Sequence, residues 1–200
     1  MADEFESEWI ALARPPADYD GGFRAGAWQH LTGPAHIVKH GVVAGYLHKL
    51  VGRGSILDAG CGEGVLCDYL DVSRFEYVAF DNSHTAVERA RASVKTGTFY
   101  SCDLDKFRPP PGTAFAAVIF NESLQESRNP FATLDRYRTF LTAKGVIIVS
   151  LFENPNVTAN GPLLIRLLTS ACSAGRYNLL ERADAVSITH SFTWRFFVLR

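Results

Sequence analysis

The stretch Ser55-Ile56-Leu57-Asp58-Ala59-Gly60-Cys61-Gly62-Glu63-Gly64 decides the fold of this chain. An apolar strand runs into three alternating glycines, which permit a sharp turn with positive φ angles and let a ligand approach bare backbone. The apolar spacing of residues 65–70 predicts a short helix directly after the turn. A strand, a glycine turn and a helix in this order are typical of a Rossmann-type nucleotide site.

The glycine spacing separates this turn from the dinucleotide fingerprint. That fingerprint reads G-x-G-x-x-G, whereas the glycines here are 60, 62 and 64, and Val65 stands at the next position. Asp58, two residues before Gly60, suits a ligand with a cationic group better than a diphosphate. An ordinary strand-to-helix turn is the alternative reading of these residues.

Composition predicts one globular domain over residues 1–200. Of its residues, 47% are hydrophobic and 20% charged, and the net charge of −1 provides no global attraction to nucleic acid or to an acidic membrane. The N-terminus lacks an apolar signal core and no apolar run approaches membrane-spanning length, so we expect a cytoplasmic protein without a membrane partner. The four cysteines show no C-x-x-C pair and no zinc-ligand spacing, which predicts reduced thiols and no bound metal.

Beyond residue 54 the chain alternates strand-like and helix-like segments. Strands are expected at residues 56–59, 77–80, 98–101, 116–120, 146–151, 185–189 and 193–199. Helices are expected at residues 36–51, 65–70, 85–94, 130–141 and 162–172. Three prolines at 109–111 leave the link between the third and fourth strands with a stunted helix or none. The last two strands are joined by a short turn, so they must pair antiparallel, and the alternation before them predicts a doubly wound, mostly parallel α/β sheet.

Asp58-x-Gly60-x-Gly62-x-Gly64 resembles the first motif of the class I, Rossmann-like S-adenosylmethionine (SAM)-dependent methyltransferases that act on small molecules. The resemblance covers residues 36–200. It implies a seven-stranded sheet in the order 3-2-1-4-5-7-6, with an antiparallel C-terminal hairpin and helices on both faces. It also implies SAM as cofactor and S-adenosylhomocysteine (SAH) as product, with Asp58, Gly60, Cys61 and Gly62 beneath the methionyl part.

Two further acids follow predicted strands. Asp81 and Asn82 end the apolar run that begins at Tyr77, about 20 residues beyond Gly60, the spacing at which an acid binds ribose hydroxyls. Capping of the next helix is the alternative role for both residues. The resemblance implies that Asp103 accepts a hydrogen bond from the adenine amino group and that the amide of Leu104 donates to a ring nitrogen. A solvent-exposed loop acid is the alternative for Asp103, and Asp105 is its near competitor.

The fourth strand ends in Phe120-Asn121-Glu122-Ser123-Leu124. The resemblance places Asn121 at the methionyl end of SAM and Glu122 at the acceptor pocket. DNA adenine methyltransferases carry an Asn/Asp/Ser-Pro-Pro-aromatic motif here, which this chain lacks. Metal-dependent catechol-type enzymes carry an Asp here and an Asp-Asn pair later, whereas this chain has Asn121 and Glu153-Asn154. The string is similar to small methyltransferases, such as the nodulation type, that methylate amino groups of sugars.

Methyl transfer from a sulfonium is an in-line displacement that needs a general base only when the acceptor is a hydroxyl or a protonated amine. The candidate bases are His30, His36, Glu122 and His190. Each also has a plainer role, with His36 and His40 on the solvent face of a helix and His190 in a hairpin turn.

Residues 1–35 are interrupted by prolines and glycines and contain Tyr19, Phe23 and Trp28. Aromatic faces attract cations such as a sulfonium, so this segment is a candidate lid that brings Tyr19 and Trp28 to the site, where His36 and Glu122 are the candidate acceptor-binding residues. Simple packing over the sheet is the equal alternative.

The sequence therefore predicts metal-independent methyl transfer from SAM to an oxygen or nitrogen of a small metabolite. A nicotinamide-dependent oxidoreductase and a non-catalytic SAM-binding partner protein are the alternatives.

Overall fold

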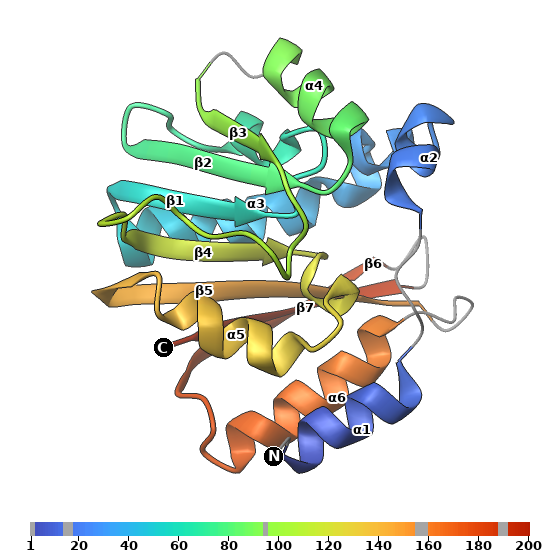
Figure 1. Ribbon diagram of the computed structural model, residues 1–200, viewed down its shortest axis with the longest axis vertical. Coiled ribbons are helices and arrows are strands. Elements are labelled where there is room, and N and C mark those ends of the chain that lie inside the picture. The colour runs from blue at the N-terminus through green and yellow to red at the C-terminus, as the bar shows by residue number, and fades with distance from the viewer. Residues whose placement is uncertain (1–2, 14–17, 94–95, 155–159, 188–191) are drawn as a thin grey trace.

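The computed structural model describes residues 3–13, 18–93, 96–154, 160–187 and 192–200, and they form one seven-stranded sheet with helices on both faces (Figure 1). The strands are β1 (Gly54–Ala59), β2 (Phe75–Asp81), β3 (Thr98–Ser101), β4 (Phe115–Asn121), β5 (Leu141–Glu153), β6 (Leu179–Ser187) and β7 (Phe192–Leu199). Their order is β3-β2-β1-β4-β5-β7-β6, parallel from β3 to β5, with β7 antiparallel to both β5 and β6. The predicted fold class, strand order and antiparallel hairpin are confirmed.

The α-helices are α1 (Glu4–Leu12), α2 (Tyr19–Arg24), α3 (Ile37–Tyr46), α4 (His84–Ser93), α5 (Pro130–Arg138) and α6 (Asn160–Ser173). Short 3-10 helices are η1 (Gln29–Thr32), η2 (Pro34–His36), η4 (Val65–Tyr69) and η5 (Leu124–Glu126), and α3 continues as the π-helical turn η3 (Leu47–Val51). No helix in the described ranges is long and apolar enough to cross a membrane.

Two apolar cores flank the sheet. On one face Val43 of α3 and Val87 of α4 pack in the same core as Ile56 of β1. On the other face Leu134 of α5 and Leu168 of α6 pack with the inner residues of β4 and β5. Because both faces are covered, the inner strands carry continuous apolar runs, such as residues 115–120 of β4 and 146–149 of β5, as is typical of parallel sheets.

The link between β3 and β4 carries no helix, as its prolines predict. Phe107 fills the space that a helix would cover, stacked on Phe80 with ring centroids 4.3 Å apart. This loop therefore stays close to the carboxyl end of β3, where Asp103 lies.

Three expected boundaries are wrong. The helix expected at 130–141 ends at Arg138 and the strand expected at 146–151 begins at Leu141, because Leu141 already pairs with Phe115 as the first residue of β5. The strand expected at 185–189 begins at Leu179, and its residues 188–189 lie outside the described ranges. This edge strand has no buried residue and is held by pairing with β7 and by an ion pair of 2.7 Å between Asp184 and Arg195. Because residues 179–184 do not alternate polar and apolar side chains, the local pattern did not reveal the start of the strand.

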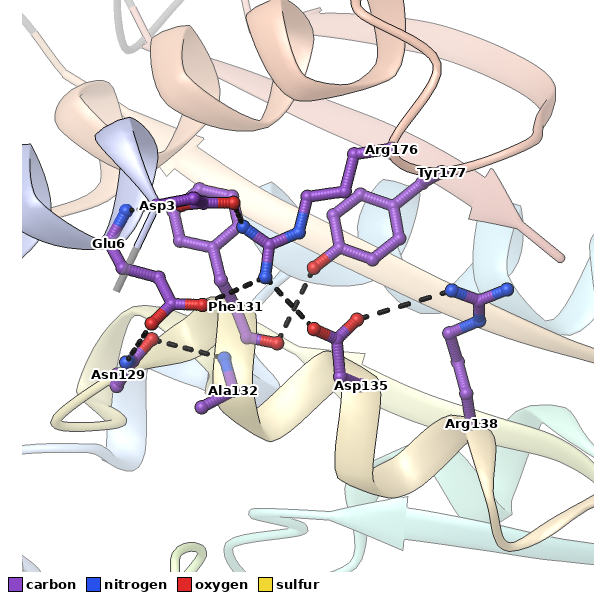
Figure 2. Close-up of polar contacts among 9 residues, drawn as sticks. All are labelled: Asp3, Glu6, Asn129, Phe131, Ala132, Asp135, Arg138, Arg176 and Tyr177. Atoms are coloured by element: carbon purple, nitrogen blue, oxygen red, sulfur yellow. Dashed lines mark hydrogen bonds and ion pairs between the residues drawn. The ribbon is translucent and has the colours of Figure 1, made fainter. Parts of the chain in front are cut away.

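Helix α1 lies beside α5 and α6, away from α2 and from the carboxyl ends of the parallel strands (Figure 1). Figure 2 shows the ion-pair cluster that fixes it: the Arg176 guanidinium lies between Asp3, Glu6 and Asp135, at 2.9 Å from the last two. Asn129 donates a further hydrogen bond of 3.1 Å to Glu6. The segment expected to act as one lid is thus two parts, of which α1 belongs to the packed body.

Candidate active site

A cavity of about 400 Å³ opens at the carboxyl ends of β1, β2 and β4. All of the predicted binding residues line it, namely Asp58, Gly60, Cys61, Gly62, Asp81, Asn82, Asp103, Leu104, Asn121, Tyr19, Trp28, His36 and Glu122. His30 also lines it, whereas His190 lies outside the described residues. Two parts of the lining are named here by the roles proposed for them below: the cofactor wall (Asp58, Gly60–Gly62, Asp81, Asp103) and the acceptor wall (Lys39, His40, Asn121, Glu122, Glu126).

The glycine turn has left-handed backbone angles and is hydrogen-bonded to β2. Gly60, Gly62 and Gly64 have φ of 82°, 55° and 78°, a region that side chains disfavour. The amides of Gly60 and Cys61 both donate to the carbonyl of Phe80, at 2.8 and 3.0 Å.

Gly60 also has no room for a side chain. A Cβ there would lie 2.5 Å from Cβ of Ser123, whose hydroxyl donates to the carbonyl of Ala59. The turn is therefore locked against the loop after β4, and Gly60 is required both for its backbone angle and for this close approach.

Asp58 lines the cavity and has one carboxylate oxygen without a partner among the described residues. The side chain is 1% exposed, and its Oδ2 accepts a 2.5 Å hydrogen bond from the Tyr77 hydroxyl. Oδ1 is buried and has no hydrogen-bond partner among the described residues. Burial raises the pKa of Asp58 to about 7, with the charge of Asp81 adding to the effect, while the Tyr77 hydrogen bond and the charge of Lys39 oppose it. A cationic ligand group is the natural complement of such an oxygen.

Asp81 ties the glycine turn to β2. Its Oδ2 accepts from the amide of Gly62 and its Oδ1 from the amide of Ser83, both at 2.9 Å. Burial raises its pKa and these backbone hydrogen bonds counteract the shift. The cap of α4 is Ser83, whose hydroxyl accepts from the amide of Ala86 at 3.1 Å, while Asn82 is exposed at the rim.

The loop after β3 separates the two competing acids. Asp105 accepts hydrogen bonds from the hydroxyls of Ser127 and Thr133, at 2.8 and 3.2 Å, and so supports the loop before α5. Asp103 accepts from the amide of Asp105 at 2.7 Å and is half-buried on the cavity. Both acids line the cavity, and of the two Asp105 is the more fully engaged by hydrogen bonds to other residues.

The solvent-face reading of His36 and His40 is wrong, because the two side chains are only 9% and 5% exposed. The Ser150 hydroxyl donates to the side-chain carbonyl of Asn121, at 2.6 Å, so the Asn121 amide nitrogen is left to donate to Nδ1 of His40, at 3.1 Å. Burial lowers the pKa of His40 to about 3, with the charges of Lys39 and His36 adding to the shift. His40 is therefore neutral, and helix α3 packs this side chain onto the end of β4.

Glu122 is committed to other side chains. It has a φ of 60°, the sole positive value among the described non-glycine residues. Its carboxylate pairs with the ammonium of Lys39, itself 3% exposed, and accepts a 2.6 Å hydrogen bond from the indole of Trp194. A carboxylate with both oxygens engaged in this way is a poor general base, so the structure favours a structural role for Glu122 at the acceptor wall.

Helix α2 is held over the glycine turn. Its Asp20 accepts hydrogen bonds from the amide of Thr85 and the hydroxyl of Ser83, at 3.0 and 2.8 Å, which lower the pKa of Asp20 to about 2. The ring of Phe23 lies next to Gly62. These contacts fix α2 to the start of α4 and place its aromatic residues on the cavity.

Beyond α2, Trp28 stacks on Tyr19 with ring centroids 5.8 Å apart, and both rings line the cavity. The two rings therefore pack on each other and line the cavity, and their role as a lid stays a prediction.

Sequence reasoning missed Lys39, Gln125 and Glu126 as residues of the cavity. Lys39 lies in a helix whose buried face depends on its packing partner. Gln125 and Glu126 lie one turn beyond β4, and this closeness to the carboxyl end of a strand is the sequence signal that could have identified them. Within the described part of the chain, no group of three or more His, Cys, Asp or Glu side chains is arranged to hold a metal ion.

Comparisons with known proteins agree with this geometry. A family model described as a methyltransferase domain matches residues 36–193. No curated protein matches the sequence.

Three solved structures share the fold at low sequence identity. The 1,6-didemethyltoxoflavin-N1-methyltransferase of Burkholderia thailandensis, bound to 1,6-didemethyltoxoflavin and SAH, has a TM-score of 0.69 at 17% identity over 100% of this chain and 91% of that one. The N-methyltransferase NodS of Bradyrhizobium japonicum with SAH has a TM-score of 0.66 at 16% identity over 98% and 99%. The plantazolicin methyltransferase BpumL with SAH has a TM-score of 0.67 at 14% identity over 98% and 93%.

Proposed function

Because this chain belongs to the methyltransferase-domain family, we propose that it transfers a methyl group from SAM to an oxygen or nitrogen of a small molecule. The observation that carries the proposal is the convergence of Asp58, Asp81 and Asp103 on one cavity, each from the carboxyl end of a different strand. The family assignment removes the nicotinamide-dependent oxidoreductase from consideration.

The cofactor wall fits SAM group by group. The unpartnered, buried Oδ1 of Asp58 would hold the cationic amino group of the methionyl part. Asp81 would accept hydrogen bonds from the ribose hydroxyls, and Asp103 with the amide of Leu104 would hold the adenine. When bound, SAM supplies an electrophilic methyl group on a positively charged sulfur. Three of the similar structures contain SAH, which supports this choice of cofactor.

The chain's own contribution to catalysis is placement and exclusion of water. Phe23 lies next to Gly62 of the glycine turn, Tyr19 and Trp28 line the cavity, and aromatic faces interact favourably with a cation. An in-line displacement gains most of its rate from alignment of the two reactants, and the departing thioether needs no acid. We infer a metal-independent reaction, for which activity unchanged by excess EDTA is the expected result.

The direct test of cofactor identity is calorimetric titration with SAM, SAH and NADH. SAM and SAH should bind with 1:1 stoichiometry, and NADH should produce no heat of binding. Asp81→Ala should weaken SAM binding by about 1.5–3 kcal/mol, the range for a hydrogen bond to a charged group. An Asp81→Ala variant that binds SAM as tightly as the wild type would contradict the ribose assignment.

Turnover separates an enzyme from a non-catalytic SAM-binding partner. Release of SAH in the presence of a broad library of small amines and alcohols supports the enzyme. Tight SAM binding with no SAH release across that library supports the binding protein.

A further inference from the structure

Seven carboxylates of described residues line the cavity, and six already have an assigned role or a cationic partner. Asp58, Asp81 and Asp103 form the cofactor wall. Glu63 pairs with Arg89 at 2.8 Å, and Glu122 pairs with Lys39. Asp105, as described above, supports the loop before α5. The seventh carboxylate is Glu126.

Glu126 has neither a cationic partner among the described residues nor a role assigned above. It lies in η5, one turn beyond the carboxyl end of β4, and accepts a hydrogen bond from the hydroxyl of Tyr19 in α2. No Lys, Arg or His of the described ranges lies within ion-pair distance of it. Burial raises the pKa of Glu126, which reflects a carboxylate without a compensating cation.

An acceptor atom without a donor among the described residues belongs to the residue just before Glu126 in the chain. Gln125 is only 9% exposed and also lines the cavity. Its Nε2 donates to the carbonyl of Glu122 at 2.6 Å, which fixes the orientation of the amide, because the opposite orientation would set two carbonyl oxygens against each other. Oε1 is consequently left buried with no partner among the described residues. A buried acceptor of this kind costs free energy unless a ligand donates to it.

We propose that Glu126 and the Oε1 atom of Gln125 form the recognition site for the methyl acceptor, and that this acceptor is an amine. The inference rests on the proposed function, because it assigns the acceptor side of the same cavity. One carboxylate and one amide oxygen, both acceptors, are complementary to an ammonium group, which offers three donors and a positive charge. A carboxylate or phosphate acceptor would be repelled by the Glu126 carboxylate.

The same carboxylate provides the proton acceptor that an ammonium requires. A protonated amine has no lone pair for attack, so one N–H proton must leave first. Glu126 accepts that proton and becomes a neutral carboxylic acid, and the nitrogen lone pair then forms the bond to the methyl carbon while the sulfur keeps the electron pair of the broken bond. The acid returns its proton to solvent after the product leaves. Tyr19 donates to Glu126 from α2, so an entering ammonium competes with a residue of the candidate lid.

The test uses matched amines and neutral analogues with the SAH-loaded protein. Benzylamine, cyclohexylamine and glucosamine are titrated against benzyl alcohol, cyclohexanol and glucose, with binding measured by calorimetry. At least one amine should bind about tenfold more tightly than its alcohol counterpart, the ratio expected for a charged hydrogen bond. Glu126→Gln should remove this preference while leaving the affinity for SAH within about twofold. Glu88→Gln, on the outer surface of α4 and paired with Arg91, is the matched control and should retain the preference.

Each outcome decides a separate point. If SAH itself fails to bind to the wild type, the proposed function fails. If SAH binds but the amines bind no better than the alcohols, or if Glu126→Gln keeps the preference, the amine assignment is overturned and the proposed function stands. Tyr19→Phe provides a second variant should Glu126→Gln not fold: loss of the competing hydroxyl should strengthen amine binding, and weaker or unchanged amine binding would count against the inference.

Discussion

The contacts within each of the two walls of the cavity join residues at very different separations along the chain. In the cofactor wall, Tyr77 reaches Asp58 and Gly62 reaches Asp81 across 19 residues each. In the acceptor wall, Lys39 and Glu122 are 83 residues apart, and Trp194 and Glu122 are 72 apart. Most of the cofactor wall is built within β1, its turn and β2, with Asp103 added from the loop after β3 and Ser123 packed against the turn from the loop after β4. The acceptor wall exists only when α3, β4 and β7 are packed together. Damage to the two walls should therefore have different consequences for stability and for cofactor binding.

The largest effect is expected from Lys39→Met in the acceptor wall. Removal of one member of a buried ion pair leaves an uncompensated charge, which costs about 3–5 kcal/mol of unfolding free energy. Urea unfolding measures it. The double variant Lys39→Met/Glu122→Gln should recover a large part of the loss, because no buried charge is then left unpaired.

The exposed pair of Arg91 and Glu88 provides the control for Lys39→Met. Arg91→Met should change stability by about 0.5 kcal/mol or less. An equally small effect of Lys39→Met would show that the acceptor wall does not depend on this ion pair.

Gly60→Ala is the corresponding test of the cofactor wall. The substitution combines a disfavoured backbone angle with a clash against Ser123. It should lower the free energy of unfolding by about 2–4 kcal/mol and abolish measurable SAM binding. Gly112→Ala is a close match, because Gly112 has a φ of 81° with no atom within 4 Å of the added Cβ. It should cost only about 1–2 kcal/mol and leave SAM binding intact. Equal losses in the two variants would mean that the close approach to Ser123 is unimportant.

Asp58→Asn should move stability and cofactor affinity in opposite directions. Because the pKa of Asp58 is raised to about 7, the folded chain binds a proton between about pH 4 and pH 7 that the unfolded chain has lost. Stability from this group therefore falls as pH rises through that window. At about pH 8 the Asn variant, which carries no buried charge, should unfold with a free energy on the order of 2 kcal/mol higher.

SAM binding to the Asp58→Asn variant should be weaker at the same pH. Urea unfolding and calorimetry measure the two effects. Asp103→Asn is the comparison, since its half-buried carboxylate should affect binding without the gain in stability. An Asp58→Asn variant that loses both stability and affinity would refute the cost assigned to the buried charge.

The smallest effect concerns the rings that cover the cavity. If Trp28 contacts the sulfonium, Trp28→Ala should weaken binding of SAM about two- to fivefold more than binding of SAH, because SAH lacks the positive charge. Calorimetry with both ligands gives the ratio. A variant that loses equal affinity for both, or none, would assign Trp28 to packing alone.

The residues of the cofactor wall could be predicted because each follows an apolar strand directly. The carboxyl ends of parallel strands meet at one edge of a sheet, so Asp58, Asp81 and Asp103 had to lie near one another once the alternation was recognised. The strand order could be predicted through the family resemblance and the antiparallel hairpin through its short connection.

The acceptor wall could not be predicted in this way. Helical periodicity shows that α3 has an apolar face, but not that His40 is drawn inward by Asn121 or Lys39 by Glu122. Those contacts join segments about 80 residues apart and depend on how α3 packs on β4. Helix α1 was not predicted for a different reason. Its Asp3-x-x-Glu6 capping pattern is present in the sequence, but the prolines and glycines that follow indicated an irregular segment.

A crystal structure with bound SAH tests the central claim most directly. The account predicts the amino group of the methionyl part at Oδ1 of Asp58, the ribose hydroxyls at Asp81 and the adenine at Asp103 and Leu104. An SAH molecule bound elsewhere, or in this cavity with its ribose away from Asp81, would contradict it.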